Sequence, residues 1–193
     1  MAGQKREQKR GRLFVVSGPS GSGKSSLCNA LLARNPNLRL SISCTTRTPR
    51  PGEEDGVQYH FLSREAFEHQ IDGEAFLEWA NVHGNLYGTR KGDVEESLAG
   101  GGDILLEIDW QGANQVAAKI TDACRIFILP PSVEELRERL TSRGQDSAEV
   151  VEKRVAAAES EIAHADEAQY RIVNDDFNRA LEELDALYLD NRS

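Results

Sequence analysis

The segment GPSGSGKSS at residues 18–26 carries residue types that cradle phosphate groups, in the pattern Gly-x-x-x-x-Gly-Lys-Ser. Glycines allow the backbone to curl with its N–H groups directed at an anion, and the N-terminus of a following helix adds a positive dipole end. Lys24 would contact the β- and γ-phosphates, and the Ser25 hydroxyl would join a Mg²⁺ shell. We therefore predict that this loop binds a nucleoside triphosphate through Gly18, Pro19, Ser20, Gly21, Ser22, Gly23, Lys24, Ser25 and Ser26.

The flanks of this loop distinguish a phosphate site from a plain connecting turn. The apolar run RLFVV at residues 12–16 precedes the loop and is typical of a buried strand. A helix is expected over residues 26–33, where three leucines share one side. A Gly/Ser-rich turn that only joins two elements is the alternative, and the strand before and the helix after the pattern favour the phosphate site.

Four further apolar runs alternate with helical patterns, which predicts an α/β fold with a parallel sheet and helices on both faces. The runs are LRLSIS, DILLEID, RIFIL and YRIVN, at residues 38–43, 103–109, 125–129 and 170–174. Ser132 with Glu135 predicts a capped helix start, and Asp146 with Glu149 a second one, whose helix is expected to run to about Ala165. The last helix is expected from the spacing of Phe177, Leu181, Leu184 and Tyr188.

Residues 38–90 interrupt this alternation with short strand candidates, a Pro/Gly-rich turn and one short helix after Ser63. They predict a small lobe inserted into a single domain, because a chain of 193 residues suits one domain with inserted parts. The expected divisions are a disordered basic leader at 1–11 and a domain at 12–193, with a core at 12–37, 91–131 and 168–193, the lobe at 38–90 and a helical lid at 132–167.

The composition is that of an ordinary globular protein, with 39% hydrophobic and 28% charged residues. No run approaches the ~18 apolar residues of a membrane span, and the first residues lack the apolar core of a signal peptide. Three widely spaced cysteines without metal-ligand grouping indicate reduced thiols. These features predict a cytoplasmic protein without a membrane partner.

The charge is unevenly distributed along the chain. The net charge is −9, but residues 1–12 hold five Lys or Arg and one Glu and so carry +4, which leaves −13 on the rest. A basic arm could touch nucleic acid or an anionic surface, and a solvated leader is the simpler interpretation. The acidic body argues against nucleic acid as the main partner.

A second group of candidate residues lies in the lobe, beginning in the loop SCTTRTPRPGE. Arg47 and Arg50 lie three apart where prolines keep the chain extended, and two guanidinium groups can grip one phosphate or carboxylate. Tyr59 and Tyr87 would add phenol donors. A pair of exposed surface arginines is the alternative, and the company of these tyrosines and of Glu78 favours a binding site.

Glu78 lies in the otherwise apolar stretch AFLEWA, where a guanine base would give its carboxylate partners. Guanine presents N1–H and N2–H₂ side by side, which one carboxylate can accept together, and O6, to which a hydroxyl can donate. Adenine lacks N1–H and the carbonyl, so it would leave the carboxylate desolvated at a cost of about 2–5 kcal/mol. Ser43 and Thr89 would complete this set, which is a hypothesis that spacing alone does not establish.

Taken together, the motifs resemble those of guanylate kinases, the ATP:GMP phosphotransferases. The blocks GPSGSGKSS, SCTTRTPRPGE, FLEWA, NLYGT, LLEIDWQG, PPSVEELRERL, RGQDS and YRIVNDDF occur in the family's order, from Leu13 to about Leu187. The resemblance implies a P-loop NTPase-type core, a lobe for a nucleoside monophosphate and a helical lid. It also implies Mg²⁺-assisted transfer of the γ-phosphoryl group of ATP to GMP or dGMP, giving ADP and GDP (or dGDP), a step of guanine nucleotide recycling.

Carried over residue by residue, the resemblance implies that GMP is bound by Ser43, Arg47, Arg50, Tyr59, Glu78, Tyr87, Thr89 and Asp109. The arginines and tyrosines would hold the phosphate, and the serine, glutamate and threonine would read the base. Asp109 ends a core strand, where the family has an acidic residue near the acceptor and the metal. Asn174 would lie near the adenine of ATP. Glu53 and Glu107 also match acidic positions of the family, with a structural role as the alternative for each.

The resemblance further implies that the catalytic cations are Lys24, Arg139, Arg143 and Arg154. Arg139 and Arg143 are four apart and share one helix face, and salt bridges with neighbouring glutamates are the alternative. Transfer between phosphates needs alignment, exclusion of water and positive charge, and the ionised GMP phosphate needs no strong base. We therefore expect an induced-fit enzyme that closes about a hinge near residues 35–40 and 90–100.

Three other functions share parts of this pattern. A kinase of another small phosphate ester, such as a ribose bisphosphate, would keep the loop but would not need Glu78 with Ser43. A guanylate-kinase-like interaction module binds protein partners and typically lacks an intact loop and lid arginines, which this chain has. A regulatory GTPase would carry an Asn-Lys-x-Asp motif, and VNDD is not one. The kinase is therefore the prediction, and it leaves the oligomeric state and the preference between GMP and dGMP open.

Overall fold

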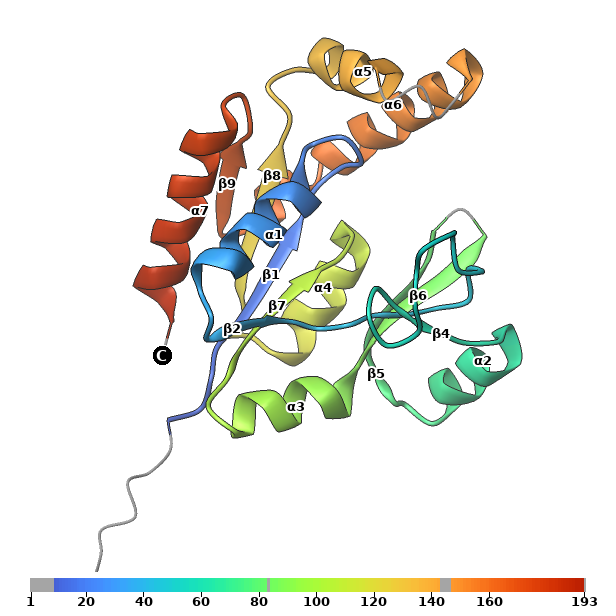
Figure 1. The fold of residues 1–193 in the computed structure, drawn as a ribbon, viewed down its shortest axis with the longest axis vertical. Helices are drawn as coiled ribbons and strands as arrows, with labels where there is room; N and C mark the ends of the chain where they lie inside the picture. Colours follow the sequence, from blue (N-terminus) through green and yellow to red (C-terminus); the bar gives the residue numbers. More distant parts are fainter. Residues whose placement is uncertain (1–8, 83, 143–146, 193) are drawn as a thin grey trace, which may run out of the picture.

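The computed structural model describes residues 9–82, 84–142 and 147–192, and its centre is a five-stranded sheet (Figure 1). The strands are β1 (Leu13–Ser17), β2 (Leu38–Leu40), β7 (Asp103–Glu107), β8 (Cys124–Leu129) and β9 (Tyr170–Val173). Their order is β2-β7-β1-β8-β9, and every neighbouring pair runs parallel. The predicted α/β class is confirmed, since each of the five apolar runs supplies one of these strands.

Helices cover both faces of this sheet because its buried strands alternate apolar side chains between the two sides. The covering helices are α1 (Lys24–Arg34), α3 (Lys91–Ala99), α4 (Trp110–Lys119) and α7 (Phe177–Asn191). Phe14 and Val16 of β1 belong to the core cluster formed with α1 and α7. Leu13 and Val15 belong to the cluster on the other face, formed with α3 and α4. All of β1 is buried, so the phosphate loop that follows it starts from a rigid strand.

The lobe is a smaller four-stranded sheet with its own apolar core. Its elements are β3 (Cys44–Thr45), β4 (His60–Phe61), α2 (Arg64–Asp72), β5 (Phe76–Val82) and β6 (Asn85–Arg90), with the strand order β4-β3-β6-β5. The Phe67 ring of α2 stacks on Phe76 of β5, with 4.4 Å between centroids. The expected boundary at residue 38 falls before β2, which pairs with β7 in the parallel sheet, so the lobe's own sheet begins only at Cys44.

The lid consists of α5 (Val133–Ser142) and α6 (Ala148–Ile162), which pack Leu136 and Leu140 against Val151 and Val155. Both ends of α6 differ from the prediction. Its start is capped by the Ser147 hydroxyl, which accepts the Val150 N–H, and Asp146 lies outside the described residues. The helix stops at Ile162 because the chain tightens into a short 3₁₀ turn at Ala165–Glu167 before β9.

The α5 start follows the prediction in part. The Ser132 hydroxyl accepts the Glu135 N–H at 3.1 Å, as in a capping box. The Glu135 carboxylate, however, pairs with Arg139 one turn later, at 3.1 Å from its Nε.

The beginning of the chain corrects the expected leader. Residues 1–8 lie outside the described residues. Gly11 is buried and donates its N–H to the Leu98 carbonyl at 2.9 Å, and Arg12 donates its N–H to Asp103 Oδ1 at 2.8 Å. A side chain on Gly11 would collide with the Gly102 carbonyl. The glycine therefore belongs to the folded domain, and the predicted boundary after residue 11 is too late.

The sequence predicts reduced cysteines and no membrane-spanning run, and both predictions can be compared with the fold. Cys28, Cys44 and Cys124 are free and buried, and burial raises the pKa of the Cys44 and Cys124 thiols to about 11. These thiols are therefore inert at neutral pH. In the part of the chain that the structure describes, we find no helix with the length and apolar character needed to cross a membrane.

Candidate active site

The loop between β1 and α1 has the conformation of a phosphate cradle. Gly18, Gly21 and Gly23 adopt φ angles of 141°, 92° and 86°, values that side-chain-bearing residues rarely adopt. Because Gly23 is the N-cap, α1 begins at Lys24, two residues before the predicted start at Ser26. The free N–H groups of the first helical turn therefore face the loop, where an anion can bind.

Two side chains of the loop already have partners. Lys24 Nζ donates to the Gly18 carbonyl at 3.0 Å and so lies across the loop. Ser25 Oγ donates to Glu107 Oε1 at 2.5 Å. Glu107 ends β7, the neighbour of β1, and the carboxyl ends of parallel strands meet at one edge of the sheet. The sequence could place Glu107 at the end of a strand, but only the strand order brings it to Ser25.

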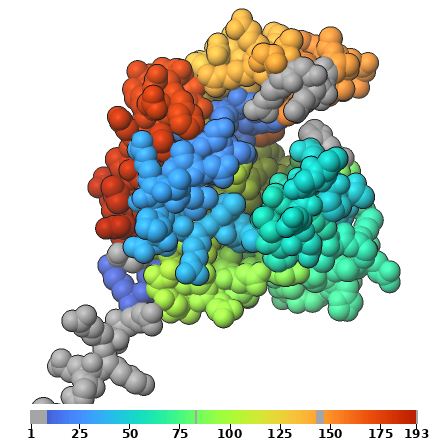
Figure 2. Space-filling model, in the orientation of Figure 1, coloured from blue at the N-terminus to red at the C-terminus, as the bar shows by residue number. Residues whose placement is uncertain are grey.

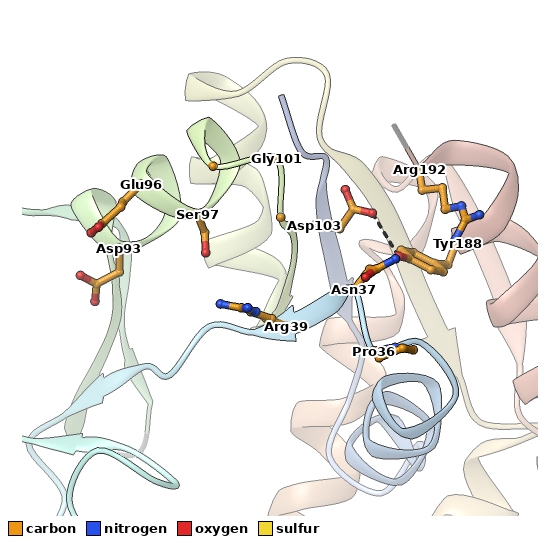
Figure 3. A pocket seen from close by; sticks show the side chains of 12 residues that line it. Pro36, Asn37, Arg39, Asp93, Glu96, Ser97, Gly101, Asp103, Tyr188 and Arg192 are labelled. Atoms are coloured by element: carbon orange, nitrogen blue, oxygen red, sulfur yellow. Dashed lines mark hydrogen bonds between the residues drawn. The ribbon is translucent and has the colours of Figure 1, made fainter. Parts of the chain in front are cut away.

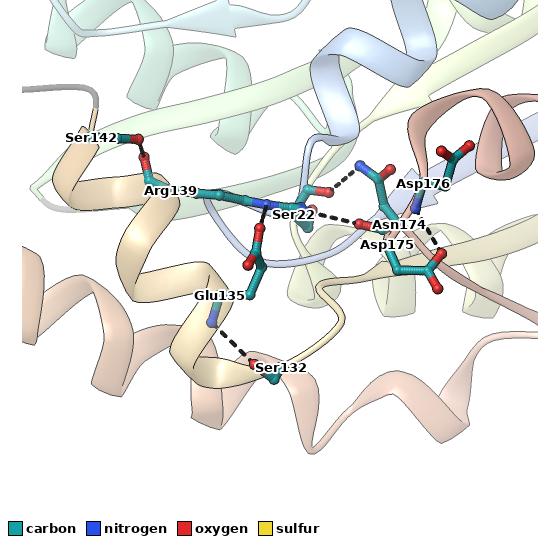
Figure 4. Close-up of polar contacts among 8 residues, drawn as sticks. All are labelled: Ser22, Ser132, Glu135, Arg139, Ser142, Asn174, Asp175 and Asp176. Carbon is teal, nitrogen blue, oxygen red and sulfur yellow. Dashed lines mark hydrogen bonds and ion pairs between the residues drawn. The ribbon is translucent and has the colours of Figure 1, made fainter.

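Asn174 and Arg139 support the loop from the side of β9 and the lid (Figure 4). Asn174 is buried and donates its Nδ2 to the Ser22 carbonyl at 2.7 Å. Arg139 donates from Nη2 to the Asn174 carbonyl at 3.1 Å and from Nε to Glu135 at 3.1 Å. Asn174 therefore holds the loop in shape, and its expected contact with adenine stays a prediction.

The lid brings a second arginine to the loop. Arg154 of α6 donates from Nη2 to the Ser20 hydroxyl. Glu152, also of α6, holds Arg137 at 2.9 Å through both carboxylate oxygens and so connects α6 to α5. Arg143, the third expected lid arginine, lies outside the described residues.

The base of the lid contacts the core through residues to which the sequence analysis gave no role. His164 stacks on Trp110 of α4 with ring centroids 3.5 Å apart and planes 6° from parallel. Glu161, in the last turn of α6, lies where burial and the Asp109 carboxylate raise its pKa, while Lys24 lowers it. No sequence motif marks either residue, because the packing of α6 on the core decides both contacts.

On the lobe, Arg47 and its neighbours form one polar-aromatic cluster. Arg47 Nη2 donates to Glu53 Oε1 at 2.9 Å, and its guanidinium lies 5.4 Å from the Tyr59 ring centroid. The Tyr59 and Tyr87 rings meet edge to face with 5.9 Å between centroids. The Arg50 N–H donates to Glu53 Oε2 at 2.7 Å, while its residue is exposed. Glu53 thus shapes the loop that carries both arginines, and the hydrogen bond from Arg47 is the largest cause that lowers its pKa.

Glu78 and Thr89 meet on facing strands of the lobe. They are register partners in β5 and β6, and Thr89 Oγ1 donates to Glu78 Oε1 at 2.6 Å. Glu78 is only 3% exposed, and burial raises its pKa to about 7. Cys44 pairs with Gly88, so the same register extended by one residue places Ser43 opposite Thr89. The structure therefore brings together the three residues expected to read a base.

Asp109 connects this pair to the core. It is the N-cap of α4, and its Oδ1 accepts the Gly112 N–H at 2.7 Å. Its charge also contributes to the raised pKa of Glu78, which places the two carboxylates near each other. The surface is hollowed between the lobe and the lid (Figure 2).

A second hollow, of about 850 Å³, lies at the opposite end of the parallel sheet and is lined by Arg39, Asp103 and Arg192 among others (Figure 3). Asp103 starts β7, and its Oδ2 accepts the Tyr188 hydroxyl at 3.0 Å, which fastens α7 to the sheet. Open α/β sheets bind ligands at the carboxyl ends of their strands. The candidate active site is therefore the loop end of the sheet and not this hollow.

Comparisons with known proteins give one consistent result. The family model described as guanylate kinase matches residues 10–190. A guanylate kinase of Bordetella pertussis is 54% identical over 174 residues, which cover 90% of this chain and 81% of that protein. One from Alkalilimnicola ehrlichii is 53% identical over 182 residues, covering 94% and 90%. A crystal structure of guanylate kinase from Anaplasma phagocytophilum matches with a TM-score of 0.79 and 33% identity, covering 95% of this chain and 87% of that one.

Proposed function

The chain belongs to the guanylate kinase family and is an ATP:GMP phosphotransferase, and we propose that it moves the γ-phosphoryl group in line onto GMP or dGMP, with Mg²⁺ and with closure of the lid. Two observations carry this proposal: a glycine-formed phosphate loop at the carboxyl end of β1, and a buried carboxylate–hydroxyl pair in the lobe, Glu78 and Thr89. The loop suits a triphosphate, and the pair suits guanine.

On the donor side, the loop backbone and the α1 N-terminus hold the β- and γ-phosphates, and Lys24 exchanges its Gly18 carbonyl partner for phosphate oxygens. Arg139 and Arg154 add positive charge from the lid, where their contacts with Asn174 and Ser20 already bring them to the loop. Positive charge on the equatorial oxygens stabilises the transition state without any side-chain nucleophile.

On the acceptor side, Arg47, Arg50, Tyr59 and Tyr87 hold the GMP phosphate. The ionised Glu78 accepts N1–H and N2–H₂ of guanine, with Ser43, Thr89 and Asp109 as its neighbours. An oxygen of the GMP phosphate attacks the γ-phosphorus, the bond from that phosphorus to the bridging oxygen breaks, and ADP leaves. The attacking oxygen is already ionised, so no general base takes part.

Ser25 and Glu107 are the residues that fit Mg²⁺. Their side-chain oxygens lie 2.5 Å apart at the mouth of the loop, and oxygen ligands are those that Mg²⁺ prefers. Within the described ranges no three or more His, Cys, Asp or Glu cluster as a metal cage. Such a site suits Mg²⁺, which keeps several waters and binds with substrate phosphates. When bound, it neutralises charge on the β- and γ-phosphates.

We propose that the lobe swings about a hinge near residues 35–40 and 90–100, and that the lobe and the lid close over both substrates. Closure would exclude water, since an open centre would hydrolyse ATP instead of transferring its phosphate. The free, buried thiols support a reducing compartment such as the cytoplasm.

The test is steady-state phosphorylation by the purified full chain, with Mg-ATP and GMP, dGMP, AMP, UMP, CMP or ribose 1,5-bisphosphate, following ADP release. We expect ADP with GMP, less with dGMP, and loss or redirection of this preference in Glu78→Gln. Equal turnover with AMP would contradict the assignment of the base-reading residues. Tight GMP binding without turnover of any acceptor would favour an interaction module.

A further inference from the structure

Helix α4 contacts the strand that carries Glu78 along one of its faces (Figure 1). Strand β5 is one of the two edge strands of the lobe sheet, so among the described residues no strand pairs with the backbone groups on its outer side. Three residues of α4, at positions 112, 115 and 119, meet β5 at successive points. Their spacing of three and four residues puts them on one helix face.

Gly112 makes room for the Glu78 carboxylate. A Cβ atom on Gly112 would lie 2.5 Å from Glu78 Oε2 and 3.2 Å from its carboxyl carbon. Both residues are buried, and Thr89 holds the other oxygen of the same carboxylate. The carboxylate is therefore fixed between a hydroxyl of β6 and the bare backbone of α4.

Gln115 and Lys119 occupy the open edge of β5. Gln115 Nε2 donates to the Trp79 carbonyl at 2.7 Å, and Gln115 Oε1 accepts the Trp79 N–H at 3.1 Å, as a neighbouring strand would. Lys119 Nζ donates to the Leu77 carbonyl at 2.6 Å and lies 3.4 Å from that of Phe76. The backbone on each side of Glu78 is thus held from α4.

The strand itself is irregular at this point. The β5–β6 register shifts between Phe76 and Glu78, which leaves Leu77 as an extra residue. Such a bulge breaks the alternation of sides and re-aims the side chains around it. Phe76 accordingly joins the lobe core, Leu77 joins the core between α3, α4 and the parallel sheet, and Glu78 faces Gly112. The extra residue of a bulge is left without a partner in the strand ladder, and here Lys119 donates a hydrogen bond to its carbonyl, that of Leu77.

We propose that Gly112, Gln115 and Lys119 are positioning residues of α4 that hold Glu78 where it reads guanine, and so set the preference for GMP. The proposal rests on the base-reading role proposed above for Glu78. Because the N-cap of α4 is Asp109, two residues after the Glu107 that bonds the Ser25 hydroxyl, one helix then connects the guanine-reading strand to the phosphate loop.

The first test measures KM for GMP, KM for ATP and the preference for GMP over inosine monophosphate, whose base lacks the 2-amino donor. Gly112→Ala should raise KM for GMP about tenfold or more, leave KM for ATP within about twofold, and narrow the preference, because the displaced carboxylate no longer meets both donors. The matched control is Gly73→Ala at the end of α2, where an added Cβ makes only ordinary contacts with the His69 and Gln70 carbonyls, at 3.5 and 3.9 Å. It should change none of the three values.

Gln115→Met keeps the helix and the side-chain length but removes both hydrogen bonds to Trp79. We expect KM for GMP to rise about three- to tenfold, with Gln70→Met on α2 as the unaffected control. If thermal melting shows that Gly112→Ala does not fold, Gln115→Met decides alone. The proposal would be overturned if the folded variants kept the wild-type KM for GMP, or if their KM for ATP rose by the same factor as their KM for GMP.

A pH profile adds a readout that a merely structural role would not move. The groups that act on Glu78 are Thr89 of β6 by hydrogen bonding, the Asp109 carboxylate, which raises its pKa, and Lys119, which lowers it. Lys119→Met should therefore move the fall in kcat/KM for GMP to higher pH, whereas Lys9→Met should not; an unmoved profile would contradict the role of Lys119.

Glu78→Gln separates this proposal from the one on which it rests. If that variant keeps the preference for GMP, the base-reading role fails whatever α4 does. If it loses the preference while the α4 variants keep it, only the positioning role fails.

Discussion

The two halves of the proposed site differ in the groups that would bind each nucleotide. The donor side is one unbroken stretch, residues 18–26, and its binding groups are mainly backbone N–H groups set by glycine conformations. The acceptor side uses side chains from β5 and β6, from the segments that flank β3 and β4, and from the loop before α4, and the pairing of these strands brings the segments together. Phosphate oxygens accept hydrogen bonds from many directions, so the N–H groups of one loop are enough to bind a phosphate. A base instead needs donors and acceptors at fixed positions.

A partial contrast appears in how the polar side chains are held, although Ser25, Arg139 and Arg154 on the donor side also bond to the side chains of Glu107, Glu135 and Ser20. Around the donor loop, Lys24, Asn174 and Arg139 bond to backbone carbonyls of the protein. On the acceptor side, Arg47 pairs with Glu53, and Glu78 with Thr89, side chain to side chain. We therefore expect substitutions on the donor side to alter ATP use alone, and those on the acceptor side to alter GMP use alone.

Lys24→Ala should have the largest effect, a fall in kcat of about 10³-fold, because it removes a full positive charge from the transferred phosphoryl group. KM for GMP should stay close to that of the wild type. Steady-state kinetics with Lys9→Ala as control measures both values. A kcat within tenfold of the wild type would place the critical charge elsewhere.

Acid should weaken GMP use before it affects ATP binding. Burial, with a smaller contribution from Asp109, raises the pKa of Glu78 to about 7, while Thr89 and Lys119 lower it. Only the ionised carboxylate accepts both guanine donors, so kcat/KM for GMP should fall below pH 7, by up to about tenfold per pH unit. The profile is measured from pH 5.5 to 8.5 in wild type and Glu78→Gln; a flat wild-type profile would contradict it.

The Glu78 carboxyl group affects stability in the opposite direction, because it stabilises the fold at the low pH at which GMP use is weakened. Because its pKa in the fold lies above the usual carboxyl value of 4.5, the folded protein binds this proton more tightly than the unfolded chain. Its contribution to stability is therefore present at low pH and is lost as pH rises from about 4.5 to about 7. Denaturant unfolding of Glu78→Gln should lack this pH dependence.

Asn174→Ala should act on the donor side only. It leaves the buried Ser22 carbonyl without its amide partner, so we expect a loss of about 1–2 kcal/mol of stability and a rise of about tenfold in KM for ATP. Asn81→Ala in the lobe is the control. If KM for GMP rose by the same factor, the donor side and the acceptor side would not bind their nucleotides independently.

Glu53→Gln should have the smallest effect, a rise of about threefold in KM for GMP. The amide oxygen can still accept hydrogen bonds from Arg47 and from the Arg50 N–H, but a neutral amide holds the Arg47 guanidinium less strongly than a carboxylate does. Glu54→Gln, next to it, serves as the control. A tenfold rise would show that Glu53 does more than shape the loop.

The accuracy of the predictions follows the same division between local and long-range features. The five core strands, the helices between them and the glycines of the loop follow from local patterns, and the structure confirms them. Boundaries were less accurate: β2 belongs to the core sheet, Gly11 to the fold, and α6 stops at Ile162. The first two depend on partners far away in the sequence, β7 and Leu98, which no local pattern contains, whereas α6 ends where the chain tightens into the 3₁₀ turn at Ala165–Glu167.

The sequence by itself determined the phosphate loop, because a single stretch holds its glycines, its lysine and its serine, and backbone conformation does the rest. It also marked Glu78 as a carboxylate in an apolar run. Only the tertiary structure decided what surrounds these residues: Glu107 at Ser25, Asn174 under the loop, Thr89 and Gly112 on either side of Glu78. Their contacts depend on strand order, register and a bulge, which are set by the packing of the whole chain.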